Sequence, residues 1–140
     1  MDNAPLISYP PAIIVHGLPD VRAALAPKLP VTLLSARGAA VYAGCGWWAA
    51  LLAAAAFNGP AFLDCGDAPG RAWEGLKLGL TGIILTPCPA WDQVAEYAAA
   101  QGATLLEAAP PALDLATPGA ARQLEGWLGG DFSAGPPAEP

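Results

Sequence analysis

Basic side chains are scarce in this chain: six lysines and arginines stand against twelve acidic residues, for a formal net charge of −6 at pH 7. The six are scattered and form no basic stripe, so the sequence predicts no nucleic-acid-binding surface. Cysteine occurs three times in 140 residues, and no two cysteines have the Cys-x-x-Cys spacing. A disulfide framework is therefore not expected, and burial of apolar side chains must stabilise the fold.

Targeting and membrane-spanning segments are not predicted either. The N-terminus has no positively charged stretch followed by an apolar one, so no signal peptide is expected, and free thiols fit a cytoplasmic location. Residues 38–63 form an uncharged run of about 26 residues, longer than the ~20 that a spanning helix needs. Because glycines and the Asn58-Gly59-Pro60 turn interrupt this run, we expect a buried helix and a strand instead of a membrane span.

Apolar residues are what the chain has in abundance, at 54% of its length. Short apolar runs predict five strands, at residues 12–16, 31–35, 61–65, 82–86 and 104–107. The intervening segments predict helices, at residues 20–28, 47–57, 70–80 and 89–102, with a last helix at 117–128 after a linker that begins at Pro110-Pro111. Such alternation is typical of α/β proteins with a parallel sheet.

We therefore expect a single three-layer α/β domain over residues 1–130, with a mostly parallel sheet of about five strands and helices on both faces. A flavodoxin-like or Rossmann-like strand order is favoured over a closed barrel, which needs about eight units. Residues 1–11 are expected to form an extended arm. Residues 131–140 are polar and rich in glycine and proline, so we expect a disordered tail there.

The fold class also predicts where a ligand binds, because open α/β sheets bind ligands outside the carboxyl ends of their strands. The residues expected near that edge are His16, Ser35, Arg37, Asp64, Cys65, Gly66, Asp67, Gly70, Thr86 and Cys88. We expect a small anionic or nucleotide-like ligand, since Ser35-Ala36-Arg37-Gly38 follows a strand and Gly44-Cys45-Gly46 precedes a helix whose N-terminus attracts anions. No cofactor and no metal is identified.

The cysteines and the only histidine support two alternatives. His16, Cys45, Cys65 and Cys88 have the ligand chemistry of a zinc site, although none of them has the usual close spacing. Alternatively, Cys88 at the start of a helix is a nucleophile with His16 as its base, which would make the protein an enzyme. The competing interpretation is that the thiols are buried and inert.

The stretch Leu63-Asp64-Cys65-Gly66-Asp67-Ala68-Pro69-Gly70 suggests a further alternative. It resembles the first motif of S-adenosylmethionine-dependent methyltransferases, in which a strand ends in an acid and a glycine-containing turn. The resemblance implies that Asp64, Gly66 and Gly70 line a cofactor pocket. The family's acid at the end of the next strand is replaced here by Thr86.

Two structural roles are also predicted. Asp67 is expected to cap the helix that follows it. A chain this apolar is expected to bury some surface between subunits, so a homodimer is predicted, and a non-catalytic oligomerising scaffold is the third candidate function.

Overall fold

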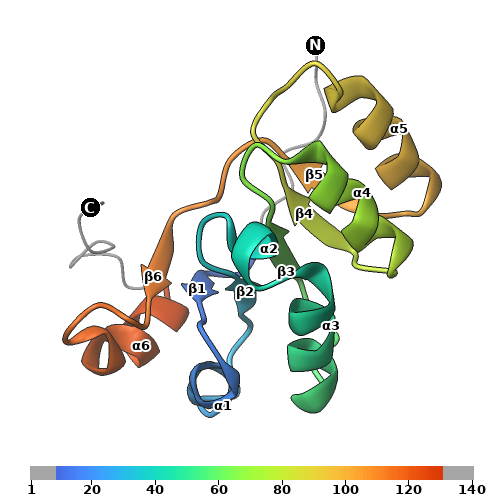
Figure 1. Cartoon of the computed structure of the whole chain (residues 1–140). Coiled ribbons are helices and arrows are strands. Elements are labelled where there is room, and N and C mark those ends of the chain that lie inside the picture. Colours follow the sequence, from blue (N-terminus) through green and yellow to red (C-terminus); the bar gives the residue numbers. More distant parts are fainter. Residues whose placement is uncertain (1–8, 131–140) are drawn as a thin grey trace.

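The computed structural model describes residues 9–130 (Figure 1). Six strands are present in this range: β1 (Ala12–Ile14), β2 (Thr32–Leu34), β3 (Ala61–Asp64), β4 (Gly82–Ile84), β5 (Thr104–Leu106) and β6 (Ala112–Asp114). They alternate with α1 (Leu18–Leu25), α2 (Ala39–Tyr42), α3 (Cys45–Ala54), α4 (Pro69–Lys77), α5 (Trp91–Ala100) and, after β6, α6 (Ala120–Leu128). The predicted α/β class with a parallel sheet is confirmed, with six strands in place of about five.

All strands are parallel, and their order across the sheet is β5-β4-β3-β2-β1-β6. This order differs from the 2-1-3-4-5 and 3-2-1-4-5-6 orders of flavodoxin-like and Rossmann-like sheets. The first five strands follow one another, and the order reverses once, where β6 returns to the free side of β1. At that point Ile14 of β1 pairs with Asp114 of β6.

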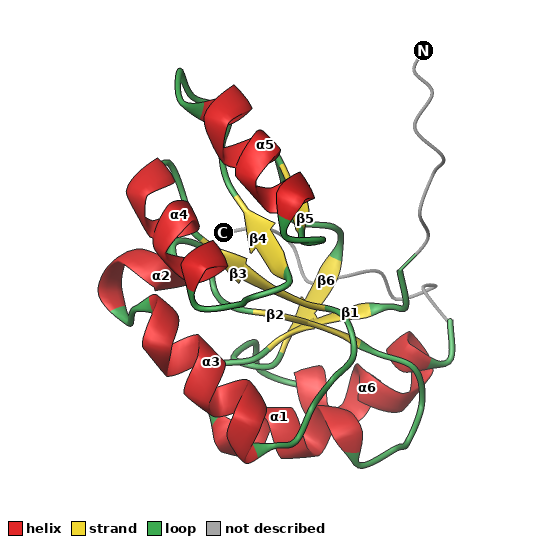
Figure 2. Cartoon of the chain, turned by 90° about the vertical axis from the view of Figure 1, so that its right-hand side faces the viewer, coloured by secondary structure: helices red, strands yellow, loops and turns green. Residues whose placement is uncertain are grey.

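The strand order also determines how the two faces of the sheet are covered. Successive right-handed crossovers between neighbouring strands pass over the same face. The larger apolar cluster accordingly contains the buried residues of all six described helices, which Figure 2 shows on one side of the sheet. The other face holds a smaller cluster of strand residues: Ala12, Leu34, Phe62 and Ile84.

No described helix contributes to this smaller cluster, which is extended by Tyr9 and by further strand residues. The ring of Tyr9 meets that of Phe62 edge-on, with centroids 5.3 Å apart. Leu106 and Ala112, at the two ends of the β5–β6 connection, also pack there. The six described helices thus lie on one face, where the sequence predicted helices on both, because a sheet built by stepwise crossovers in one direction leaves its second face without helices.

The core on the helical face is closely packed. Trp48 of α3 is fully buried, and burying a side chain of this kind stabilises a fold by about 1.5–3 kcal/mol. Gly82 lets β3 and β4 approach each other, since a Cβ atom there would overlap the carbonyl oxygen of Ala61 and the ring of Phe62. Within the described residues, no helix is long and apolar enough to cross a bilayer.

Three local predictions are wrong. The segment after Pro110-Pro111, expected as a linker, contains β6. The cap of α4 is Ala68 with no side-chain hydrogen bond, because the turn at Gly66 delays the helix beyond Asp67. Cys88, expected at the start of a helix, precedes α5 instead, because its carbonyl accepts from the Trp91 amide in a turn before the helix. The predictions for residues 1–8 and 131–140 lie outside the described residues.

Candidate functional site

The carboxyl ends of all six strands lie along one edge of the sheet, because the strands are parallel. Two polar groups occur along this edge. The first, which we call the Asp64 cluster, consists of Ser35, Gly38, Asp64 and Gly66 and lies beyond β2 and β3. The second, which we call the His16 junction, consists of His16, Asp20, Asp114 and Ala116 and lies where β1 meets β6.

The Asp64 cluster is held together by hydrogen bonds between its members. Asp64 ends β3 and is only 9% exposed. Its Oδ1 atom accepts hydrogen bonds from the backbone amides of Gly38 at 3.0 Å and Gly66 at 2.8 Å. Gly66 has a φ of 59°, a left-handed conformation that suits glycine and turns its amide back toward the carboxylate. Its carbonyl accepts from the Thr86 amide at 2.8 Å, which connects the turn to the loop after β4.

Ser35 belongs to the same cluster and is also fully engaged. Its Oγ atom donates to the carbonyl oxygen of Ala36 at 3.0 Å and accepts from the Asp64 amide at 2.9 Å. A hydroxyl that donates to a backbone carbonyl is not poised as a nucleophile, because no base receives its proton. The turn expected to hold an external anion thus already binds an anion, the carboxylate of Asp64.

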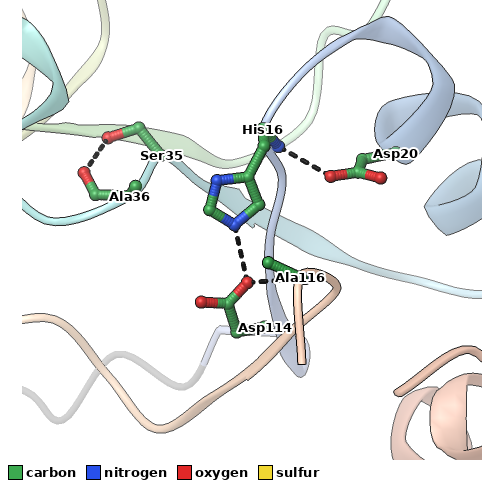
Figure 3. A network of polar contacts seen from close by, with 6 residues as sticks. All are labelled: His16, Asp20, Ser35, Ala36, Asp114 and Ala116. Atoms are coloured by element: carbon green, nitrogen blue, oxygen red, sulfur yellow. Dashed lines mark hydrogen bonds and ion pairs between the residues drawn. The ribbon is translucent and has the colours of Figure 1, made fainter. Parts of the chain in front are cut away.

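The His16 junction is open to solvent. The Nε2 atom of His16 lies 2.6 Å from Oδ1 of Asp114, and the two side chains are 36% and 35% exposed (Figure 3). The same carboxylate oxygen accepts from the Ala116 amide at 2.9 Å. On the other side, the His16 amide donates to Oδ2 of Asp20 at 2.9 Å, which ties the end of β1 to the first turn of α1.

The geometry of this pair assigns the imidazole tautomer. An ionised carboxylate can only accept hydrogen bonds, so the Nε2 atom of His16 must carry the proton that it shares with Asp114. In the neutral ring, the lone pair is then on Nδ1. Within residues 9–130 the structure gives Nδ1 no hydrogen-bond partner. The junction therefore offers a ring nitrogen, on a partly exposed side chain, to which the described residues donate no hydrogen bond.

The cysteines are poor candidates for chemistry. Burial raises the pKa of the Cys65 thiol to about 12, with smaller contributions from Cys45 and Asp64. Burial, followed by the charge of Glu74, also raises the pKa of Cys45, whose Sγ donates to the Arg71 carbonyl at 3.2 Å. Both thiols therefore stay protonated at neutral pH. Cys88 is partly buried and packs against the larger apolar cluster.

The other expected site residues are spread along the edge. Arg37 and Asp67 are exposed in the loops after β2 and β3, and Thr86 is exposed after β4. Gly70 is the second residue of α4, where a Cβ atom would meet open space. Of the ten expected residues, the structure brings Ser35, Asp64 and Gly66 into one hydrogen-bonded cluster. It places His16 in the separate junction.

Sequence reasoning missed the partner of His16. Asp114 lay in a segment expected as a linker because β6 has only three residues between proline-containing stretches. A signal was present: Ala112-Leu113-Asp114 repeats the pattern of Phe62-Leu63-Asp64, two apolar residues followed by an acid. A short parallel strand ending in a carboxylate could have been inferred from that repetition.

Metal binding and known families complete the description of the site. Within the described part of the chain, no group of three or more His, Cys, Asp or Glu side chains is arranged to hold a metal ion. His16, Cys45, Cys65 and Cys88 therefore do not form the zinc site considered above. No protein-family model matches the chain, and no curated protein matches its sequence. The methyltransferase resemblance rests on the residues quoted for it alone.

Proposed function

We propose that this protein binds a small molecule at the carboxyl edge of its sheet, at the His16 junction. The observation that carries this proposal is the contact of 2.6 Å between His16 and Asp114 at the point where the strand order reverses. Reversals of strand order are where open α/β sheets bind their ligands. The rest of the polar edge supports the choice, because the Ser35 hydroxyl and the Oδ1 atom of Asp64 already have partners within the protein.

The charges at the junction narrow the expected ligand. Asp20 and Asp114 both direct carboxylate oxygens toward His16. A phosphate placed against two carboxylates would be repelled, whereas a neutral or cationic group would not. Of the anionic and nucleotide-like ligands expected from the sequence, we therefore favour those that present a neutral polar part, such as a ribose or another polyol, to His16.

A library of small molecules tests this proposal. Polyols, nucleosides, amines and nucleotides would each be added at millimolar concentration, with binding read from the melting temperature and from the ring proton resonances of His16. The chain has one histidine, so these resonances belong to a single residue. Binders are expected to shift them and to lose affinity in a His16→Ala variant. Glu107→Ala is the matched control, because Glu107 is an exposed acid after β5, at the far side of the sheet.

The outcomes are distinct. A compound that raises the melting temperature of the parent but not of His16→Ala supports the proposal. If no compound moves the His16 resonances, or if binding survives in His16→Ala and is lost in Glu107→Ala, the junction is not the ligand site.

We retain self-association as a second candidate, since exposed apolar side chains lie on two helices in contact. Val41 and Tyr42 of α2 are 53% and 71% exposed, and Trp73 of α4 stacks on Tyr97 with ring centroids 4.4 Å apart. Sedimentation of the full chain tests this candidate. A dimer that Tyr42→Lys converts to monomer supports it, and a monomeric parent at high concentration rejects it. The cysteine-based enzyme has no comparable support, because Cys88 lies before the start of α5 and packs partly buried against the larger apolar cluster.

A further inference from the structure

We propose that His16 is the proton acceptor of this site, and that its Nδ1 atom receives the proton of a hydroxyl group on a small, uncharged ligand or on water. This inference rests on the proposed function, because it names the chemistry of the same junction. It goes further by assigning the atom that reacts and the class of group that it recognises.

The two nitrogens of the His16 ring have different roles. Asp114 occupies Nε2 at 2.6 Å, and a carboxylate has no proton to give, so this nitrogen is a donor. The lone pair of the neutral imidazole is then confined to Nδ1. In Figure 3, Nδ1 lies on the side of the ring away from Asp114. A hydrogen-bond donor approaching His16 can therefore bind at this nitrogen without displacing the carboxylate.

The second step is that both the ring and the backbone of His16 are held by carboxylates. Asp114 is fixed in turn by the Ala116 amide at 2.9 Å, and the His16 backbone by Asp20 at 2.9 Å. Pairing of Ile14 with Asp114 keeps the two strand ends in register. A base fixed in this way loses little conformational freedom when it binds a ligand, which favours both binding and proton transfer.

The third step is the transfer of a proton from the ligand hydroxyl to Nδ1. When the ligand hydroxyl gives up its proton, the O–H bond breaks and an N–H bond forms at Nδ1, leaving an alkoxide or hydroxide and an imidazolium. The carboxylate of Asp114, in contact with the Nε2–H group, stabilises that imidazolium. Asp20 adds a second negative charge near the backbone of His16. The carboxylate of Asp114 on the other ring nitrogen therefore favours a neutral group over an anion at Nδ1.

The fourth step identifies where the reacting oxygen comes from. Ser35, the hydroxyl residue at the end of the neighbouring strand, donates to the Ala36 carbonyl and does not supply it. The Cys65 thiol is buried and protonated. In this proposal the oxygen belongs to the ligand or to solvent, and the ligand class that fits is a neutral polyol or the ribose of a nucleoside.

Carbethoxylation by diethyl pyrocarbonate tests the assignment of Nδ1, because the reagent reacts with an unprotonated imidazole nitrogen. The sole histidine gives a single imidazole adduct, whose position on the ring is read by NMR. In the parent chain we expect the adduct mainly on Nδ1. In Asp114→Ala, which leaves Nε2 free, we expect it to move toward Nε2, whereas Glu107→Ala should leave it on Nδ1.

A second variant separates charge from geometry. Asp114→Asn keeps an oxygen acceptor against Nε2, so the adduct should stay on Nδ1. An adduct on Nε2 in the parent, or an unchanged position in Asp114→Ala with circular dichroism showing intact folding, would overturn the inference.

The ligand class has its own test. Glycerol and adenosine should shift the His16 ring resonances at millimolar concentration, whereas inorganic phosphate should leave them unchanged. A shift with phosphate alone would contradict the preference for neutral hydroxyl groups. If the adduct forms on Nδ1 but no compound is found to bind, the assignment of Nδ1 as proton acceptor is supported and the proposed function is rejected. An Nε2 adduct together with binding at His16 would reject only the proton acceptor.

Discussion

Two aspartates end strands at the same edge of this sheet, and their surroundings differ. Asp64, at the end of β3, is 9% exposed and accepts from two backbone amides. Asp114, at the end of β6, has a side chain 35% exposed and accepts from one amide and from the His16 ring. One carboxylate is enclosed by glycine-containing turns, while the other faces solvent together with a titratable partner.

The comparison shows how the same residue type at equivalent places serves the fold in one case and is available to a ligand in the other. Buried polar groups must find partners inside the protein, and Asp64 finds them in Gly38 and Gly66. Asp114 accepts one hydrogen bond from a backbone amide, that of Ala116, and its other contact is with the imidazole ring of His16. Mutation of Asp64 should therefore reduce stability more than ligand binding, whereas mutation of Asp114 should reduce ligand binding more than stability.

The largest effect is expected for Asp64→Ala. The substitution leaves the amides of Gly38 and Gly66 without their acceptor in a partly buried place, so the free energy of unfolding should fall by about 2–4 kcal/mol. Urea unfolding followed by tryptophan fluorescence measures this. Asp64→Asn, which keeps an oxygen acceptor, should lose clearly less. A loss below about 1 kcal/mol in Asp64→Ala would show that the cluster is not enclosed as described.

The next effect concerns alkaline pH. The pKa of Cys65, the residue after Asp64, is raised to about 12 from 9.0, so between these values the unfolded thiol loses its proton while the folded one keeps it. The unfolded state then binds fewer protons, and the free energy of unfolding falls as pH rises, by at most about 1.4 kcal/mol per pH unit for this group. Cys65→Ala should reduce the slope, and Cys88→Ala, at a partly exposed thiol, should retain it. Equal slopes in the parent and Cys65→Ala would contradict the burial argument.

A smaller effect is expected from Gly66→Ala, which tests the backbone that encloses Asp64. An alanine at a φ of 59° is destabilised by about 1–2 kcal/mol relative to glycine. Gly70→Ala is the matched control, since it lies in the first turn of α4 with no atom close to the added carbon, and it should be neutral or slightly stabilising. Thermal unfolding compares the two. If both variants behave alike, the turn does not require glycine.

The smallest change in stability is expected for Asp114→Ala. Partly exposed charged pairs contribute about 0.2–1 kcal/mol, so this variant should unfold only slightly more easily than the parent. Its effect on the His16 ring should nevertheless be large, as carbethoxylation would show. A loss as great as that of Asp64→Ala would mean that the junction serves the fold, and the contrast between the two aspartates would disappear.

The sequence predicts most of the strands and helices of this fold, but of the His16–Asp114 pair it predicts only His16. Buried strands such as Ile13-Ile14-Val15 are recognisable because apolar, β-branched runs stand between polar turns. The edge that gathers polar residues then follows from the parallel arrangement. Helix starts are less predictable, because the turns after Gly66 and at Cys88 depend on hydrogen bonds between loops that lie far apart in sequence.

There is also a physical reason why the sequence did not predict Asp114 as the partner of His16. β6 is three residues long, and its pairing with β1 spans about 100 residues of sequence, so no local pattern specifies it. The helices on a single face were missed for the same reason, since strand order is a long-range property. Residue type alone also could not distinguish Asp64 from Asp114; only the amides of Gly38 and Gly66 do so.

The distance along the chain between His16 and Asp114 has a practical consequence. The two residues are 98 positions apart, and each comes from a different side of the point where the strand order reverses. A polypeptide that ends after β5 would keep five strands and every residue of the Asp64 cluster, yet it would contain only one partner of the His16–Asp114 pair. Adding residues 107–130 as a separate peptide would restore the pair only if β6 docks on β1. The ring resonances of His16 would then report whether the two fragments have assembled.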